Sequence, residues 1–433
     1  MGNYKNAAGE EVRVAKAQRN QVTLHWHSLD QLIRPDHPAR YVWKYVESLD
    51  LSAFYLDIHA VAGGVGRDAV DPKILLALWI LATLEGVASA RRLAELCTRD
   101  FAYLWLCGEV TVNRDLLNDF RSRHPQALDA LMTETIGVLL QHDLVSLDCV
   151  AQDGMRVRAS AGKSSFRRQS TLADHLRIAR EHVAQMRQED DDDQGGRSRQ
   201  EAARQRAAEG RIARLEQAIE AGKQLESERQ KQSRNENKEV RSSTTDGEAR
   251  VMKMADGGYR PAYNVQFATT AHTRIIVGVD VVNRGGDSGQ MRPMVERLAG
   301  DFQRLPQQYL VDGGFSSRDD TTHLEQLGVQ VYAPLKSEQK LLDKGENPYA
   351  RRAGDTDEYY AYRQRMKSPA AKELYKLRAS TAEFANAGCR NRGLQRFLVR
   401  GQAKARIIAV WQALAHNLQR IVHHGWLPTL LTR

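Results

Sequence analysis

The sequence has few cysteines and no long apolar run. Its 433 residues contain four scattered cysteines, none with the Cys-x-x-Cys spacing of a zinc site. This distribution argues against a zinc site or a disulfide framework and favours a reducing compartment. The longest apolar run, residues 74–84, is shorter than the roughly 18 residues that span a bilayer. Since residues up to Gln21 are polar and lack a signal-peptide pattern, we expect a cytoplasmic protein with no membrane partner.

Acidic residues are fewer than basic ones. The chain has 54 Asp and Glu against 63 Lys and Arg, a formal net charge of +9 and an isoelectric point near 9.3. This excess favours a polyanionic partner, provided that the charge lies where a nucleic acid can reach it. The histidine pairs His25/His27 and His423/His424 have no companion ligands nearby. We therefore interpret them as interfacial side chains rather than as metal ligands.

The N-terminal third has the pattern of an all-helical domain. Asp71 followed by proline predicts a helix over residues 71–85, and Ser89 is the expected N-cap of a second helix that ends near residue 97. The short turn between them predicts either a helix-turn-helix, with Arg91 and Arg92 toward DNA, or a compact bundle with solvated arginines. Asn113 is the expected N-cap of a further helix.

Beyond residue 142 the pattern changes to strands. Every second residue from Val145 to Asp153 falls on one face of an extended chain, and this period of two predicts a strand that ends in Asp153-Gly154. Another strand, residues 309–311, ends in Asp312-Gly313. The remaining expected elements are strands at 263–268, 274–282 and 329–333 and helices at 319–327, 370–383 and 402–423.

The segment 171–240 has the composition of a charged insertion. Apolar residues from Leu172 to Met186 follow a heptad spacing, and a similar seam continues at Ile212, Leu215 and Ile219. The pattern predicts an antiparallel helical hairpin, with a disordered charged linker as the alternative.

These patterns divide the chain into four parts. They are a basic flexible N-terminus (1–23), a helical DNA-binding domain (24–142), a catalytic domain (143–400) that contains the insertion, and a C-terminal segment (401–433) whose helix packs on the catalytic domain.

Three acids stand out by their positions. Asp153 and Asp312 each end a predicted strand before a glycine, and Glu383 lies in the helical segment after the last strand. Three carboxylates at one sheet edge make an oxygen cage for Mg²⁺ or Mn²⁺. Two such ions activate the attacking oxygen of a displacement and stabilise the leaving oxygen. The acids that rank behind them are Asp148, Asp280, Asp287 and Glu373, of which Asp287 stays a minor candidate because it follows a Gly-Gly turn.

With these acids, the sequence resembles the bacterial insertion-sequence transposases of the DDE type. That family combines a helical N-terminal domain with a ribonuclease-H-like catalytic domain. The motifs that carry the resemblance are GRDAVDP (66–72), SARRL (89–93), DGMRVRAS (153–160), PAYNVQ (261–266), VDGGF (311–315) and the region 375–401. Together they extend over about residues 24–422.

The resemblance implies an α/β protein with a ribonuclease-H-like mixed sheet, an all-α N-terminal domain and a helical-hairpin insertion. It assigns catalysis and the binding of two Mg²⁺ or Mn²⁺ ions to Asp153, Asp312 and Glu383, with Asp153 bridging both ions. The family's spaced Tyr, Arg, Glu and Lys correspond here to Tyr375, Arg378, Glu383 and Arg390. Four residues separate Arg378 from Glu383, where many relatives have three, and arginine replaces the usual lysine but keeps its charge.

The implied function is a DNA transposase that cleaves at the ends of an insertion sequence and joins them to target DNA, acting as a homodimer in the nucleoid. The expected DNA contacts are Arg91, Arg92, Arg156, Arg158, Lys163, Arg378, Arg390 and Arg392. The basic run over residues 390–400 suits DNA phosphates, or is a solvated loop. Two alternatives remain: a transposase-derived DNA-binding protein that no longer cuts, and a ribonuclease-H-like nuclease that cuts without joining.

Overall fold

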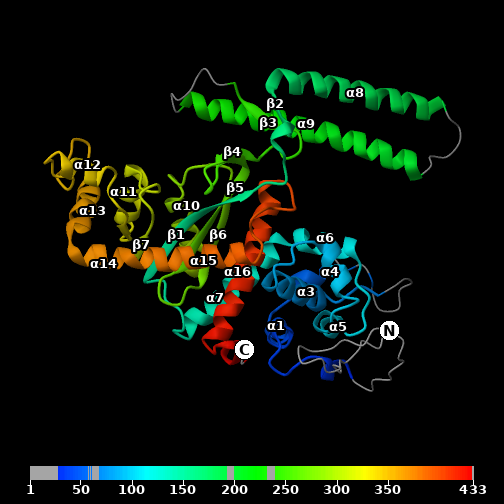
Figure 1. Ribbon diagram of the computed structural model, residues 1–433, viewed down its shortest axis with the longest axis horizontal. Helices are drawn as coiled ribbons and strands as arrows, with labels where there is room; N and C mark the ends of the chain where they lie inside the picture. The colour runs from blue at the N-terminus through cyan, green and yellow to red at the C-terminus, as the bar shows by residue number, and fades with distance from the viewer. Residues whose placement is uncertain are drawn as a thin grey trace, which may run out of the picture.

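A computed structural model gives the architecture of the chain and describes residues 28–56, 58, 60, 68–192, 199–231 and 239–431. Figure 1 shows a helical N-terminal part, a mixed sheet flanked by helices, and a long helical hairpin that extends away from both. The expectations for residues 1–23, for the pair His25/His27 and for residues 66 and 67 of the first motif lie outside the described residues.

The N-terminal part is helical, as expected. Its elements are η1 (Leu29–Leu32), α1 (Pro38–Glu47), α2 (Ser52–Tyr55), α3 (Pro72–Leu84), α4 (Ala90–Leu96), α5 (Phe101–Cys107), α6 (Arg114–Arg123) and α7 (Pro125–Gln141). The three predicted N-caps are confirmed, because the side chains of Asp71, Ser89 and Asn113 each accept a hydrogen bond from a backbone N–H in the first turn. Helix starts were predictable because each cap acts within three residues.

Helix α3 forms the centre of this bundle. Its residues from Ile74 to Thr83 are buried, and the indole of Trp79 donates to the carbonyl of Leu117 at 3.0 Å. Helix α4, by contrast, leaves the Arg91 and Arg92 side chains 79% and 56% exposed. Among the described helices none is both long and apolar enough to cross a membrane.

The second part is a six-stranded mixed sheet. Its strands are β1 (Cys149–Arg158), β4 (Arg250–Lys253), β5 (Tyr259–Thr270), β6 (Ile276–Val282), β7 (Gln308–Leu310) and β8 (Gln330–Tyr332). Strand β1 pairs antiparallel with β5 on one edge and parallel with β7 on the other, and β8 continues parallel to β7. The far edge of β5 pairs with β4 and then with β6.

The predicted end of the first strand is wrong. Strand β1 continues past Asp153 to Arg158, so that Asp153 lies in its middle. The cause is the twelve-residue β5, which supplies a backbone partner as far as Ala262. On the other edge the backbone of Arg158 bonds with Gln395 and Phe397.

Helices cover the sheet on both sides (Figure 1). The helical elements that follow β6 in the chain are α10 (Met291–Phe302), α11 (Arg318–Gln326), α12 (Glu338–Asp343), α13 (Asp357–Lys367), α14 (Pro369–Arg378), the π turn η3 (Ala379–Glu383), α15 (Phe384–Asn391), α16 (Gln402–His423) and α17 (Leu427–Leu431). Of these, α10, α12, α13 and α17 were not predicted. Helix α16 packs on β6 and on α3, and the Asn417 side chain bonds both backbone groups of Ile276 at 2.8 Å. The C-terminal helix thus joins the sheet to the bundle.

The insertion is a helical hairpin, as predicted, rather than a disordered linker. Helices α8 (Gln169–Asp192) and α9 (Arg199–Lys231) bury a small cluster of Leu172, Ala179, Leu215 and Ala218 between them. The heptad seam therefore closes within one chain. A two-stranded ribbon, β2 (Phe166–Arg168) with β3 (Arg241–Ser243), connects the hairpin to the sheet.

A buried histidine makes the stability of this fold pH-dependent. His416 on α16 hydrogen-bonds the Arg274 carbonyl and lies 3.1 Å from a guanidinium nitrogen of Arg392. Burial, with neighbouring arginines, lowers the pKa of His416 to about 4. Since the folded state favours the neutral ring, its stabilising contribution is complete above about pH 6.5 and declines as the pH falls toward 4.

We expect this one residue to lower the free energy of unfolding by about 2 kcal/mol between pH 7.5 and pH 5. Urea denaturation at both pH values measures the loss. His416→Gln is expected to show a smaller loss than the parent, whereas His423→Gln, at an exposed position on the same helix, retains the parent's loss. Equal pH dependence in parent and His416→Gln would contradict the assignment.

Candidate active site

The middle of β1 carries a carboxylate that is held by one helical segment. Asp153 accepts a hydrogen bond from Arg378 Nη2 at 3.2 Å on one oxygen and from Asn386 Nδ2 at 2.9 Å on the other. Arg378 ends α14 and Asn386 lies in α15, two elements of one segment interrupted only by η3. Both side chains are largely buried, so the segment is fixed across the sheet at Asp153.

The second aspartate lies beside the first because of strand register. Strands β1 and β7 are parallel, with Ala151 opposite Leu310. Continuing this register by two residues sets Asp153 level with Asp312, which follows the end of β7 as the sequence predicted. Neighbouring strands are about 4.8 Å apart, so this register implies that the backbones of Asp153 and Asp312 are separated by about one strand spacing.

The charges around Asp153 agree with this placement. Burial raises the pKa of Asp153 above its ordinary value, the Arg378 guanidinium opposes the rise, and Asp287 and Asp312 add to it. The pKa of Tyr375 is also raised, first by burial and then by Asp312 and Asp153. Asp153 therefore lies close to Arg378 and Tyr375, two residues of the expected signature.

Glu383, the third expected acid, is exposed and ends the π turn η3. In an α-helix the five steps from Arg378 to Glu383 rotate the side chain by about 500°, which leaves it about 140° from the starting direction. The i→i+5 bonding of a π turn instead brings the fifth residue back over the first. Within the described part of the chain, no hydrogen bond or ion pair joins the exposed Glu383 to Asp153 or Asp312.

Two neighbours of Asp153 carried weaker signals in the sequence. Asn386 was not predicted, although it lies eight residues after Arg378, a spacing of about two helical turns that places both on one face. Asp287, a minor candidate, accepts hydrogen bonds from Asn264 at 2.7 Å and Gln266 at 2.8 Å. Its carboxylate lies directly over Gly154, where a Cβ atom would come within 2.1 Å of Oδ1.

The oxygen atoms around Asp153 are of the chemical type that binds hard divalent cations. Two carboxylates share one level, and the Asn386 amide oxygen is buried beside them without a hydrogen-bond partner. Carboxylate and amide oxygens are suitable ligands for Mg²⁺. Over the described ranges, no three His, Cys, Asp or Glu side chains gather closely enough to hold an ion. The structure thus brings together two of the three expected acids, and the third stands apart.

The predicted DNA contacts fall into different settings. Arg156 donates to the Gly285 carbonyl at 2.7 Å and 3.1 Å, and Arg378 is engaged with Asp153. Arg392 is buried and bonds Gln419 and His416, because the chain turns inward after α15. The expectation that Arg392 contacts DNA therefore finds no support in the structure. The exposed members of the set are Arg91, Arg92, Arg158, Lys163 and Arg390.

Two family models match the chain. The one described as a transposase domain (DUF772) matches residues 27–123, which include the helices from η1 to α6. The one described as a transposase DDE domain matches residues 225–418, which include Asp312 and Glu383. The chain belongs to the DDE transposases of insertion sequences. Comparison with curated proteins and with solved structures gave no match.

The resemblance expected from the sequence is thereby confirmed at the level of the family. The matched ranges leave out Asp153 and most of the hairpin of this transposase. The assignment of Asp153 therefore depends on its geometry: its level beside Asp312 and its contacts with Arg378 and Asn386.

Gly154 is the position at which the site tolerates no side chain. We expect Gly154→Ala to displace Asp287 and Gln266 and to lower the free energy of unfolding by about 1–3 kcal/mol, as overpacking does elsewhere. Urea denaturation measures the effect. Gly300→Ala is the matched control, since Gly300 lies in α10 with no atom within 4 Å of a built Cβ. A Gly154→Ala variant as stable as this control would show that the close approach is not real.

Proposed function

We propose that this transposase cleaves DNA at the ends of its insertion sequence and joins the freed strand to target DNA, using Asp153, Asp312 and Glu383 as catalytic acids with two Mg²⁺ or Mn²⁺ ions. The proposal is carried by the position of Asp153 in β1 beside the parallel strand β7, which ends two residues before Asp312, and by the family-signature arginine bonded to Asp153. The two family matches support it independently.

The strand arrangement supports a ribonuclease-H-like catalytic domain. Antiparallel β1, β5 and β6 are extended by parallel β7 and β8 on the other edge of β1. This arrangement sets the centre of β1 beside the end of β7. It therefore supports the choice of Asp153 and Asp312 as the first two acids of the proposed set, with Asp153 within its strand and not at the strand end.

The residues around Asp153 have distinct proposed roles. Asp153, Asp312 and Glu383 would hold the ions, and the buried oxygen of Asn386 offers a further donor. When bound, divalent ions activate the attacking oxygen and stabilise the leaving one. Arg378 offsets the buried negative charge of Asp153 in their absence, since an unpaired buried carboxylate is costly. Tyr375 lies near both aspartates, and its hydroxyl group is the proposed contact with the DNA phosphate to be cut.

The helical N-terminal part is the proposed reader of the insertion-sequence ends. Helix α4 presents Arg91 and Arg92 to solvent, each paired with Glu95 on its own helix. Such exposed pairs contribute little stability, so both guanidinium groups are free to exchange Glu95 for phosphate. Arg158, Lys163 and Arg390 are the proposed phosphate contacts of the catalytic part.

Substitution of the acids is expected to separate chemistry from binding. Asp153→Asn, Asp312→Asn and Glu383→Gln should each reduce cleavage in Mg²⁺ by at least about 100-fold, since even changes beyond the ligands themselves cost 10- to 100-fold. DNA binding should persist, because acids near DNA contribute little attraction. Glu373→Gln is the control: Glu373 is an exposed acid of the same helical segment, paired with Lys376.

The assay follows an end-labelled DNA fragment that carries one insertion-sequence end and scores both nicked and joined products. Joined product from the parent distinguishes a transposase from a nuclease that only cuts. Full cleavage by Asp153→Asn or Asp312→Asn would rule out the carboxylate mechanism. Loss of cleavage in Glu373→Gln, together with full activity in Glu383→Gln, would transfer the third role to Glu373.

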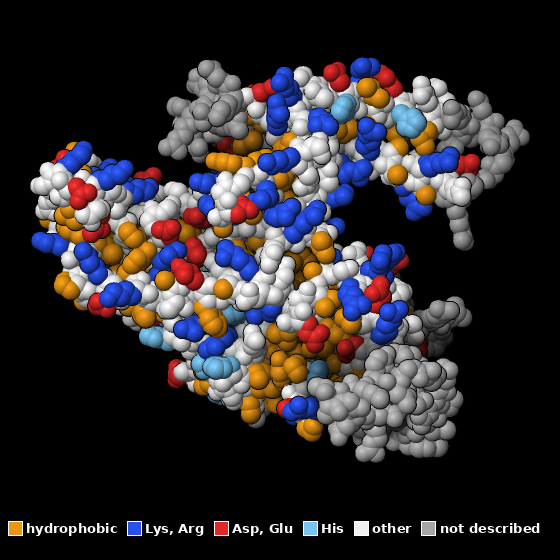
Figure 2. Space-filling view, viewed as in Figure 1, with side chains coloured by type: hydrophobic (Ala, Val, Ile, Leu, Met, Phe, Trp, Pro, Cys, Tyr) orange, Lys and Arg blue, Asp and Glu red, His pale blue; other side chains and the backbone are white. Residues whose placement is uncertain are grey.

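The hairpin is the proposed assembly element that holds two DNA ends together. It protrudes from the sheet, and its side chains carry many charges of both signs (Figures 1 and 2). Since its apolar seam closes internally, partner contacts would come from its outer faces, for example at Ile178, which is 52% exposed. We expect replacement of residues 176–214 by a short Gly/Ser linker to prevent pairing of ends.

Light scattering with and without end DNA measures this effect. The replacement keeps Leu172 and Leu215 at the base of the hairpin, so the ribbon β2–β3 and the catalytic part are retained. A variant that pairs ends and transposes as well as the parent would exclude the hairpin as an assembly element and leave the catalytic assignment unchanged.

A further inference from the structure

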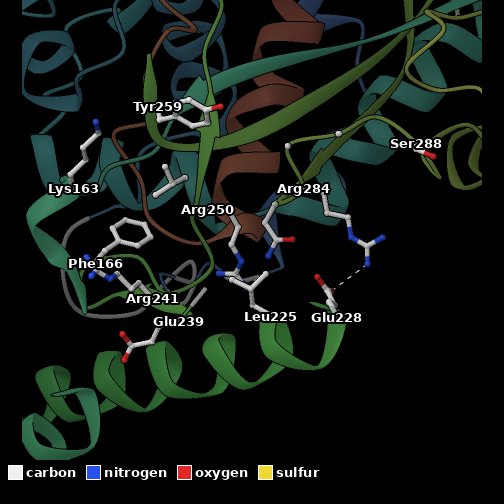
Figure 3. Close-up of a pocket in the computed structure, with 14 residues that line it drawn as sticks. Lys163, Phe166, Leu225, Glu228, Glu239, Arg241, Arg250, Tyr259, Arg284 and Ser288 are labelled. Atoms are coloured by element: carbon white, nitrogen blue, oxygen red, sulfur yellow. Dashed lines mark hydrogen bonds and ion pairs between the residues drawn. The ribbon is translucent and has the colours of Figure 1, made fainter. Parts of the chain in front are cut away.

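A cleft of about 940 Å³ lies between the base of the hairpin and the edge of the sheet (Figure 3). One wall is formed by Leu225 and Glu228 of α9, and the other by Arg250, Val251 and Tyr259 of β4 and β5. The ribbon β2–β3 closes one end, and the loop that follows β6 borders the other. The cleft thus exists only because the insertion folds back over the sheet.

The cleft is positively charged. Its acids are already paired: Glu228 with Arg284 at 3.3 Å and Glu239 with Arg168 at 2.9 Å. Lys163 and Arg241 are exposed at the same end of the cleft. Neither forms an ion pair with another described residue. Figure 2 shows further Lys and Arg side chains around the junction of hairpin and sheet. This surplus of unpaired cations would attract phosphate groups.

The cleft also exposes aromatic and apolar surface between these cations. The Tyr259 side chain is 57% exposed, and Val251 on the paired strand β4 is 47% exposed. Phe166 of β2 lies half-buried on the side of Lys163. An exposed ring between cationic side chains is the arrangement with which proteins hold unpaired nucleotides, since each base stacks on a ring while its phosphates meet the charges.

The cleft borders the loop that carries Asp287. Its border includes Gly285, Gly286 and Ser288, and the same loop carries Asp287 over Gly154, the neighbour of Asp153. Arg156, also on β1, fixes this loop through the Gly285 carbonyl. The cleft thus lies beside a loop that packs against β1, on the face of the strand opposite to the Asp153 side chain.

We propose that this cleft binds a single-stranded segment of DNA, with Tyr259 stacked on an unpaired base and Lys163 and Arg241 on its phosphates. A duplex stacks its bases on one another and offers no free base face to the ring, which is why the ligand is the single strand. The proposal rests on the proposed function, because it takes the DNA on which the transposase acts as the source of the single strand.

The test measures binding of a fluorescent 20-nucleotide oligothymidylate and of a 20-base-pair duplex by anisotropy, in EDTA. Tyr259→Ala should weaken oligothymidylate binding at least about fivefold, and Tyr259→Phe should restore it, since the ring alone stacks. Arg241→Ala should reduce the slope of log affinity against log salt by about 0.7, the value of one phosphate contact on a single strand. Arg304→Ala, an exposed arginine before β7, should match the parent.

Duplex binding should change little in Tyr259→Ala. Equal losses on duplex and single strand would overturn the assignment to unpaired DNA, and unchanged oligothymidylate binding in both Tyr259→Ala and Arg241→Ala would overturn the site itself. Photo-crosslinking of a 5-iododeoxyuridine oligonucleotide gives a second readout, with the adduct expected on Tyr259 or Phe166 and an adduct elsewhere counting against the cleft. Because EDTA stops catalysis, these outcomes are independent of whether the parent cleaves DNA.

Discussion

A buried negative charge in the middle of β1 is the constraint on which the rest of the catalytic part depends. A carboxylate placed in a sheet is unfavourable unless it is paired and hydrogen-bonded. Asp153 meets this condition through Arg378 and Asn386, which come from a helical segment more than 200 residues later in the chain. That pairing fixes the segment over the sheet and brings Tyr375 and Arg378 of the signature close to the two aspartates. The charge for which we propose a catalytic role is also one that holds the segment where it packs.

The remaining architecture positions this charge from both edges of β1. The long strand β5 supports one edge and the parallel strand β7 the other, so Asp153 cannot move without disturbing the whole sheet. Helix α16 connects the sheet to the N-terminal bundle through contacts with β6 and α3. The proposed DNA-reading helices are therefore packed onto the same framework as the acids, which suits an enzyme that must recognise an end and cut it at a set distance.

The insertion adds a surface that the compact sheet does not have. Its seam is satisfied internally, since Leu172, Ala179, Leu215 and Ala218 are buried between its two helices. The ribbon β2–β3 then turns it across the edge of β4 and β5, where it creates a basic cleft beside the loop of Asp287. We thus propose two roles for the inserted element: its outer faces serve assembly, and the cleft at its base binds the single strand.

The sequence by itself determined those features that depend on neighbours a few residues apart. The caps at Asp71, Ser89 and Asn113, the heptad seam from Leu172 and the amphipathic C-terminal helix were readable because each involves contacts within one or two turns. The tertiary structure alone decided that β1 extends past Asp153, that Asn386 holds its carboxylate and that Arg392 turns inward. Each of these depends on backbone pairing or burial between distant segments, and no local pattern records which distant partner a residue will meet.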